Sequence, residues 1–121
     1  MQLNSLHPNV LGRAYLAGPM SGKLELNIPA FVEATAFLRT QGYNLIPPHE
    51  HLGPSNDSDL EYSLTLGRDI MLLSQCDSII LLPGWEKSRG ASLEHQFAVI
   101  TNKIIVEYDR IRSFFLSREQ S

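Results

Sequence analysis

Short apolar runs alternate with amphipathic segments along most of the chain. Four runs are apolar nearly throughout and end at glycine, proline or polar residues, which predicts buried strands; they span residues 14–17, 43–46, 77–82 and 104–106. In the intervening segments, apolar residues recur at the three- and four-residue spacing of a helix. This spacing predicts helices over about residues 27–41, 59–73, 88–100 and 110–118.

Strands that are apolar on both sides are expected where helices cover both faces of a sheet. Their alternation with helices implies a mostly parallel sheet with right-handed crossovers. We therefore expect a single α/β domain over residues 1–121. Its first part, residues 1–12, is expected to be a loose lead-in. Asn27 and Ser88 are expected to cap helices, Gly42 to end one, and Asp109 to cap the last.

Composition narrows the class of protein. The chain is 43% hydrophobic and 19% charged, as expected for a folded domain, and its net charge of −3 argues against non-specific binding to nucleic acid. Cys76 is the only cysteine, so no internal disulfide or cysteine zinc cluster is expected. No apolar run approaches the ~20 residues of a membrane span, and the N-terminal residues lack the pattern of a signal peptide. These features predict a cytoplasmic protein.

Two loops carry glycine and serine directly after predicted strands. The first spans Gly18–Gly22 and the second Pro83–Gly90. Because parallel strands end at one edge of a sheet, both loops should face one crevice, where backbone N–H groups and hydroxyls could hold a small anion. Either loop alone is more simply explained by the needs of a turn. A Gly-x-Gly-x-x-Gly or Walker lysine motif is missing, so dinucleotide and triphosphate binding are not supported.

Two carboxylates come from helices next to this crevice. Glu94 lies in the first turns of the helix after the second loop, and Asp69 lies on the helix before the 77–82 strand. Paired carboxylates suit cleavage of an acetal-like bond, although spacing alone favours solvated helix acids. The Tyr15 hydroxyl could reach the crevice and hydrogen-bond Glu94, or Tyr15 could simply pack in the core. Asp77 is expected to be structural.

Other candidates have weaker patterns. Residues 47–58 are expected to be a long loop, and the motif His49-Glu50-His51 within it suggests a metal site only remotely, because Pro47-Pro48 argue against a strand there. Trp85 could stack on a base at the crevice edge or pack on a loop. His95 is expected at the surface.

The ordered motifs resemble a known superfamily. They are Tyr15–Gly22 (YLAGPMSG), Asn27–Phe31 (NIPAF), Arg68-Asp69, Cys76-Asp77 and Leu82–Ala91 (LPGWEKSRGA), followed by Glu94 and Ala98. Together, over residues 13–107, they are similar to the nucleoside 2-deoxyribosyltransferase-like superfamily, and most to a small phage and bacterial branch near the 2′-deoxynucleoside 5′-phosphate N-hydrolases. The resemblance implies a Rossmann-like or flavodoxin-like three-layer sandwich with four or five mostly parallel strands.

The same resemblance implies cleavage of an N-glycosidic bond. The pattern Ser88-Arg-Gly90-Ala91-Ser-Leu-Glu94 matches the family motif whose glutamate attacks the anomeric carbon. Tyr15 matches the tyrosine that orients it, and Asp69 the aspartate that contacts or protonates the base. No cofactor is expected, and neither is a nucleic acid polymer or a membrane partner. A homodimer or higher oligomer is implied.

Ser88 separates two substrate classes within the superfamily. Relatives that act on free nucleosides commonly have aspartate there, whereas those that hydrolyse nucleoside 5′-monophosphates have serine, which does not repel a phosphate. A nucleotide is therefore favoured, with its phosphate on Ser88, Gly90, Ala91 and the loop Gly18, Pro19, Met20, Ser21 and Gly22. That loop lacks the basic residue common in such hydrolases, and Lys23 or Arg89 could supply the charge. Transfer between bases and nucleotide binding without catalysis are the alternatives, and the base and the sugar stay open. The 47–58 loop and Trp85 are expected to line the base pocket.

Overall fold

A computed structural model describes residues 6–20, 27–51 and 59–119 of the chain. Within these ranges, four strands form one sheet: β1 (Arg13–Ala17), β2 (Asn44–Ile46), β3 (Ser78–Leu81) and β4 (Ile104–Glu107). The described residues also form five α-helices and two short 3₁₀ helices: α1 (Pro8–Leu11), α2 (Ile28–Thr40), η3 (Pro48–His51), α3 (Asp59–Ser74), η4 (Trp85–Lys87), α4 (Arg89–Ile100) and α5 (Tyr108–Glu119). The α/β expectation is confirmed.

The sheet is parallel throughout, in the order β2-β1-β3-β4. From β1 the chain passes first to β2 on one side and then across to β3 on the other, so the order reverses between β1 and β3. Ala17 pairs with Leu81 at the carboxyl ends of these two strands, and the Leu82 N–H donates to the Ala17 carbonyl at 2.8 Å. The loops after β1 and β3 therefore start side by side at the point where open α/β sheets bind ligands.

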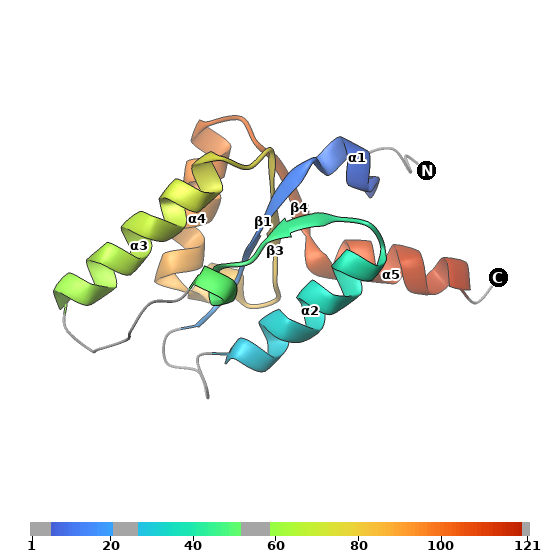
Figure 1. Ribbon diagram of the computed structural model, residues 1–121, viewed down its shortest axis with the longest axis horizontal. Coiled ribbons are helices and arrows are strands. Elements are labelled where there is room, and N and C mark those ends of the chain that lie inside the picture. The colour runs from blue at the N-terminus through green and yellow to red at the C-terminus, as the bar shows by residue number, and fades with distance from the viewer. Residues whose placement is uncertain (1–5, 21–26, 52–58, 120–121) are drawn as a thin grey trace.

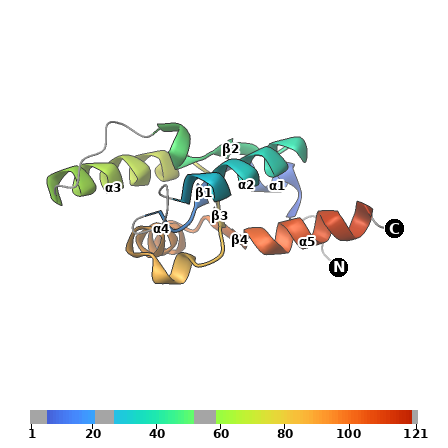
Figure 2. The ribbon, with the colours of Figure 1, turned by 90° about the horizontal axis from the view of Figure 1, so that it is seen from below.

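Helices cover both faces of the sheet, which makes three layers (Figures 1 and 2). Alternate residues of each strand point to opposite faces, so Leu16 and Ile80 pack with α1, α2 and α5, whereas Tyr15 and Ile79 pack with α3 and α4. This two-sided burial explains why the strands are apolar runs. The three-layer, Rossmann-like sandwich expected from the sequence and the resemblance is confirmed, with four strands among the described residues where four or five were expected.

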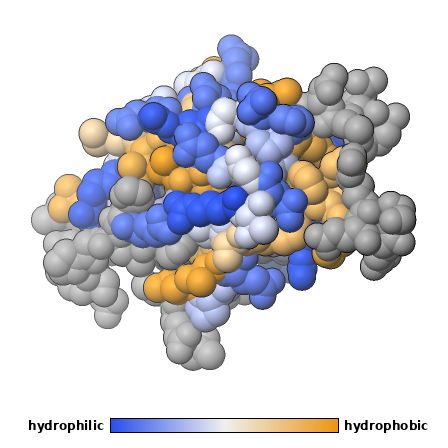
Figure 3. All heavy atoms as spheres, turned by 45° about the vertical axis from the view of Figure 1, so that its right-hand side comes forward, coloured by the Kyte–Doolittle hydropathy of each residue, from blue (hydrophilic) through white to orange (hydrophobic). Residues whose placement is uncertain are grey.

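The surface is mixed in character. Figure 3 shows hydrophobic residues lying between hydrophilic ones on one face of the molecule. Among the described residues, no helix is long and apolar enough to cross a membrane.

Three local expectations are wrong. Of the predicted lead-in, residues 1–5 lie outside the described residues, but residues 6–12 are not loose, because they contain α1 and bury Leu6 and Leu11 in the core. Asn27 precedes α2 but makes no side-chain cap; its backbone is left-handed, with φ of 61°, and its amide nitrogen donates instead to the Pro19 carbonyl at 2.9 Å. The last helix begins at Tyr108, directly after β4, so Asp109 lies in its first turn rather than at the cap.

The predictions at two other helix ends are confirmed. Ser88 caps α4, with its hydroxyl oxygen accepting the Ala91 N–H at 3.2 Å. Gly42 follows the end of α2 with φ of +96°, a conformation that favours glycine.

Candidate active site

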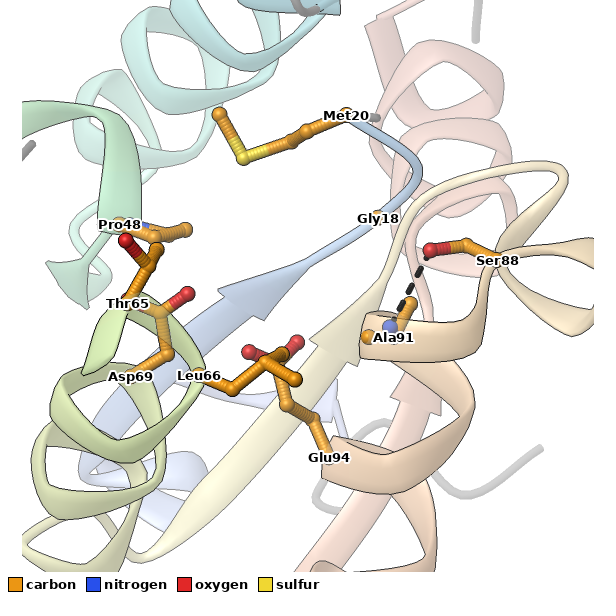
Figure 4. A pocket seen from close by; sticks show the side chains of 10 residues that line it. Gly18, Met20, Pro48, Thr65, Leu66, Asp69, Ser88, Ala91 and Glu94 are labelled. Carbon is orange, nitrogen blue, oxygen red and sulfur yellow. Dashed lines mark hydrogen bonds between the residues drawn. The ribbon is translucent and has the colours of Figure 1, made fainter. Parts of the chain in front are cut away.

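A cleft opens at the carboxyl edge of the sheet, between the loop after β1, the start of α4 and the side of α3 (Figure 4). Its volume is about 70 Å³, which accommodates a phosphate-sized group or a few water molecules. A larger ligand would extend beyond these walls. The lining residues are Gly18, Met20, Pro48, Thr65, Leu66, Asp69, Ser88, Gly90, Ala91 and Glu94.

Glu94 lies at the base of this cleft and is only 5% exposed. Ala91, Glu94 and Ala98 share the face of α4 that packs on the sheet, so helical spacing directs the carboxyl group inward. Across the cleft base, the Tyr15 hydroxyl of β1 donates a 2.7 Å hydrogen bond to Glu94 Oε2. The hydrogen bond suggested by the sequence is therefore present, and it joins residues 79 positions apart.

Burial makes Glu94 an unusual acid. Loss of hydration is the main cause that raises its pKa to about 8; the Tyr15 hydrogen bond lowers the pKa and the nearby Asp69 charge raises it. The pKa of Tyr15 is also raised well above its usual value, first by burial and then by the charge of Glu94. Tyr15 therefore stays protonated and acts as a hydrogen-bond donor to Glu94.

Asp69 brings a second carboxyl group to the same cleft from α3 (Figure 4). Burial raises its pKa to about 6, partly offset by the neighbouring Arg68 charge. Between pH 6 and 8 the two carboxyl groups together therefore hold about one proton, which resides mainly on Glu94. Neither is the solvated helix acid that spacing alone favours.

The start of α4 forms the opposite wall. Ser88, Gly90 and Ala91 all line the cleft there, and Ser88 still has a hydroxyl proton to donate after its oxygen caps the helix. The first turn of a helix also carries N–H groups without carbonyl partners in that helix and the positive end of its dipole. This wall is suited to a negatively charged group.

The loop after β1 is described only as far as Met20. Gly18 lines the cleft and is closely packed, because a Cβ there would lie 2.8 Å from Leu82 Cβ. Pro19 is buried, its carbonyl held by Asn27, and Met20 packs between the core and the cleft. Ser21, Gly22 and Lys23 lie outside the described residues.

Trp85 does not join the cleft. Trp85 belongs to η4, and its ring packs against His95 with ring centroids 4.3 Å apart and ring planes tilted by 36°. It also packs against the α3–α4 side of the core. His95 is thereby partly covered rather than a free surface side chain. Asp77 is structural as expected, because its carboxylate accepts the Arg13 N–H at 2.9 Å at the opposite edge of the sheet.

The metal motif is only partly described. Residues 48–51 form η3 instead of open loop, and Glu50 forms a two-bonded ion pair with Arg39, at 2.7 and 2.9 Å. The side chains of His49 and His51, and residues 52–58 of the expected loop, lie outside the described residues. Within the described ranges, no group of three or more His, Cys, Asp or Glu side chains could hold a metal ion.

Sequence reasoning missed two lining residues, Thr65 and Leu66, whereas Pro48 belongs to the 47–58 loop that was expected at the base pocket. Pro48, Thr65 and Leu66 complete the wall opposite α4. Helical spacing offered a signal for Thr65, because it lies one turn before Asp69 and therefore on the same face of α3.

Comparison with known proteins adds a family without a known activity. No curated protein matches the chain. One family model, described as a domain of unknown function (DUF4406), matches residues 12–107, which include every described residue that lines the cleft. The protein therefore belongs to the DUF4406 family.

Proposed function

We propose that this protein hydrolyses the N-glycosidic bond of a nucleoside or deoxynucleoside 5′-monophosphate, with Glu94 as nucleophile, and releases free base and sugar phosphate. One observation carries the proposal: the buried Tyr15–Glu94 pair shares a cleft with Asp69, and the start of α4 lines the other side. The motif resemblance to the nucleoside 2-deoxyribosyltransferase-like superfamily supports the same reaction.

The reaction proceeds in two balanced steps. A Glu94 carboxylate oxygen bonds to C1′ while the C1′–N bond breaks; its electron pair leaves with the base, and Asp69 in its acid form gives the base a proton. Water then attacks C1′, the bond to Glu94 breaks with its electrons returning to the carboxylate, and Asp69 takes the proton. Two displacements at C1′ retain its configuration.

Proton placement is the demanding part of this mechanism. The reaction needs charge on Glu94 and a proton on Asp69, whereas the pKa values of about 8 and 6 favour the opposite arrangement. Moving one proton between the two carboxyl groups produces the reactive form without changing their total charge. Tyr15 assists because its donated hydrogen bond stabilises the Glu94 carboxylate.

The phosphate binds at the start of α4. Ser88 can donate its hydroxyl proton there, and the helix end favours an anion. Ser88→Asp tests this assignment, because aspartate also caps helices well but adds a negative charge. We expect kcat/KM for 5′-monophosphates to fall at least about 10-fold while that for free nucleosides does not fall. An equal loss on both would refute a phosphate at Ser88.

The central experiment is a chromatographic screen of ribo- and deoxynucleoside monophosphates for base release. Glu94→Gln should reduce release by roughly 10³-fold or more, because an amide cannot replace the nucleophile. Glu86→Gln is the matched control, an exposed acid that does not line the cleft, and should keep the wild-type rate. Wild-type release by the Glu94 variant would refute the mechanism.

The same assay separates the alternatives. If the base is replaced by an added second nucleobase and is not released without one, the protein is a transferase. If a nucleotide binds and no base is released, the protein is a binding module. Homo-oligomeric assembly and a cytoplasmic location stay predictions.

A further inference from the structure

The two walls of the cleft differ in chemistry (Figure 4). The wall at the start of α4, with Gly18 beside it, presents backbone and hydroxyl groups, which suit the sugar and phosphate in the proposed function. The wall formed by η3 and α3 combines two apolar side chains, Pro48 and Leu66, with two polar ones, and Met20 adds another apolar side chain. Apolar surfaces of this kind suit the faces of a nucleobase.

Only two polar side chains line the η3–α3 wall within the described residues: Thr65 and Asp69. They lie four residues apart on α3 and therefore on one face of that helix, one turn from each other. The edge of a nucleobase offers a hydrogen-bond donor next to an acceptor. Asp69 accepts as a carboxylate or donates in its acid form, and a hydroxyl can donate or accept, so the two side chains can pair with adjacent groups on one edge.

Among the described residues, the Thr65 hydroxyl has no strong hydrogen-bond partner. Thr40 and Thr101 use their hydroxyls to donate to the carbonyl four residues earlier, at 2.8 and 2.7 Å. In the described residues, the Thr65 side chain has one weak contact, in which its oxygen accepts from Arg68 Nη2 at 3.5 Å. Threonine is also a modest helix former, so its presence in the middle of α3 has no local explanation.

We propose that Thr65 determines which nucleobase the cleft accepts, by hydrogen bonding to the edge of the base next to the group that Asp69 contacts. This assignment rests on the proposed function, because it requires a nucleotide in the cleft. Thr65 is a specificity-determining residue here, and it takes no part in breaking the glycosidic bond.

Calorimetry can test base selection separately from catalysis. Dissociation constants are measured for four deoxynucleoside 5′-monophosphates on Glu94→Gln protein, which keeps a bound nucleotide intact. The same measurements follow with Thr65→Val, which replaces the hydroxyl by a methyl group of similar size, and with Thr65→Ser, which retains the hydroxyl. Ser63→Ala is the matched control, since Ser63 is exposed on α3 and does not line the cleft.

We expect Thr65→Val to weaken binding of the preferred nucleotide roughly 10- to 100-fold and to change the others by less than about 3-fold. Thr65→Ser should retain most of the preference for that nucleotide, and Ser63→Ala should leave the preference unchanged. An equal loss for all four nucleotides, no loss for any, or no measurable binding would overturn the assignment. Base release by the wild-type protein is measured separately. If the protein binds nucleotides but releases no base, the proposed function is refuted, and the binding measurements still test the role of Thr65.

Discussion

Replacing Glu94 by glutamine should change how protein stability depends on pH. Glu94 is 5% exposed and its pKa is raised to about 8 in the folded protein, compared with 4.5 for an unperturbed glutamate. The folded state therefore holds this proton more tightly than the unfolded chain does. Its stabilising contribution is complete below pH 4.5 and is lost as the pH rises toward 8, because ionising a buried carboxyl group costs free energy.

The size of the effect follows from the two pKa values. Linkage predicts that the free energy of unfolding of the wild-type protein falls by about 4 kcal/mol between pH 5 and pH 9 because of this one group. Glutamine has nearly the same shape, still accepts the Tyr15 hydrogen bond and does not ionise. The Glu94→Gln protein should therefore lack this fall and become progressively more stable than the wild type as pH rises.

Urea denaturation at several pH values between 5 and 9 measures the difference directly. Glu86→Gln is again the control, because an exposed side chain is hydrated in both states and its removal should leave the wild-type pH dependence intact. Asp69 titrates in all three proteins, so its contribution to the pH dependence of the free energy of unfolding largely cancels when they are compared. Parallel stability curves for the wild type and the Glu94 variant would refute the conclusion that Glu94 is a buried, hard-to-ionise acid.

Three further predictions follow from the site and from α3. The pH profile of kcat/KM for base release should be bell-shaped, with limbs near pH 6 and 8 from Asp69 and Glu94. Tyr15→Phe should move the upper limb to higher pH, because it removes a hydrogen bond that lowers the pKa of Glu94. An upper limb at the wild-type pH would contradict this. Gly18→Ala should reduce the free energy of unfolding, measured in urea, by roughly 1–3 kcal/mol, because its Cβ would overlap a neighbouring side chain; an unchanged midpoint would show that the space exists. Gly67→Ala should instead raise the free energy of unfolding by about 1 kcal/mol, because alanine favours a helix more than glycine does and nothing lies within 4 Å of the added Cβ in α3. A lower urea midpoint would contradict that.

Much of the fold could be predicted because it depends on local patterns. The 14–17 and 77–82 runs, short and bounded by turn residues, predicted strands covered on both sides, and β1 and β3 match them within a residue or two. The cap at Ser88 was also predictable, because capping needs only a hydroxyl three residues before an N–H. Parallel strands then required the loops after β1 and β3 to meet, which identified one edge of the sheet as the place for a site.

Other features depended on contacts between distant segments. Nothing local in residues 6–12 indicated that Leu6 and Leu11 belong to the core, because their burial comes from packing with α2 and α5. Asn27 had the right position for a cap, but the Pro19 carbonyl competes for its side chain. Trp85 lies within a crevice loop, yet its ring packs against the His95 ring away from the cleft.

The sequence by itself therefore determined the sheet, its two covered faces and the edge at which Glu94, Asp69 and Ser88 lie. Only the tertiary structure decided what kind of acid Glu94 is. Its pKa depends on hydration lost to elements packed around it, on a hydroxyl from β1 and on a charge from α3. Electrostatic interactions of this kind act through space and burial, and a linear pattern of residues contains neither.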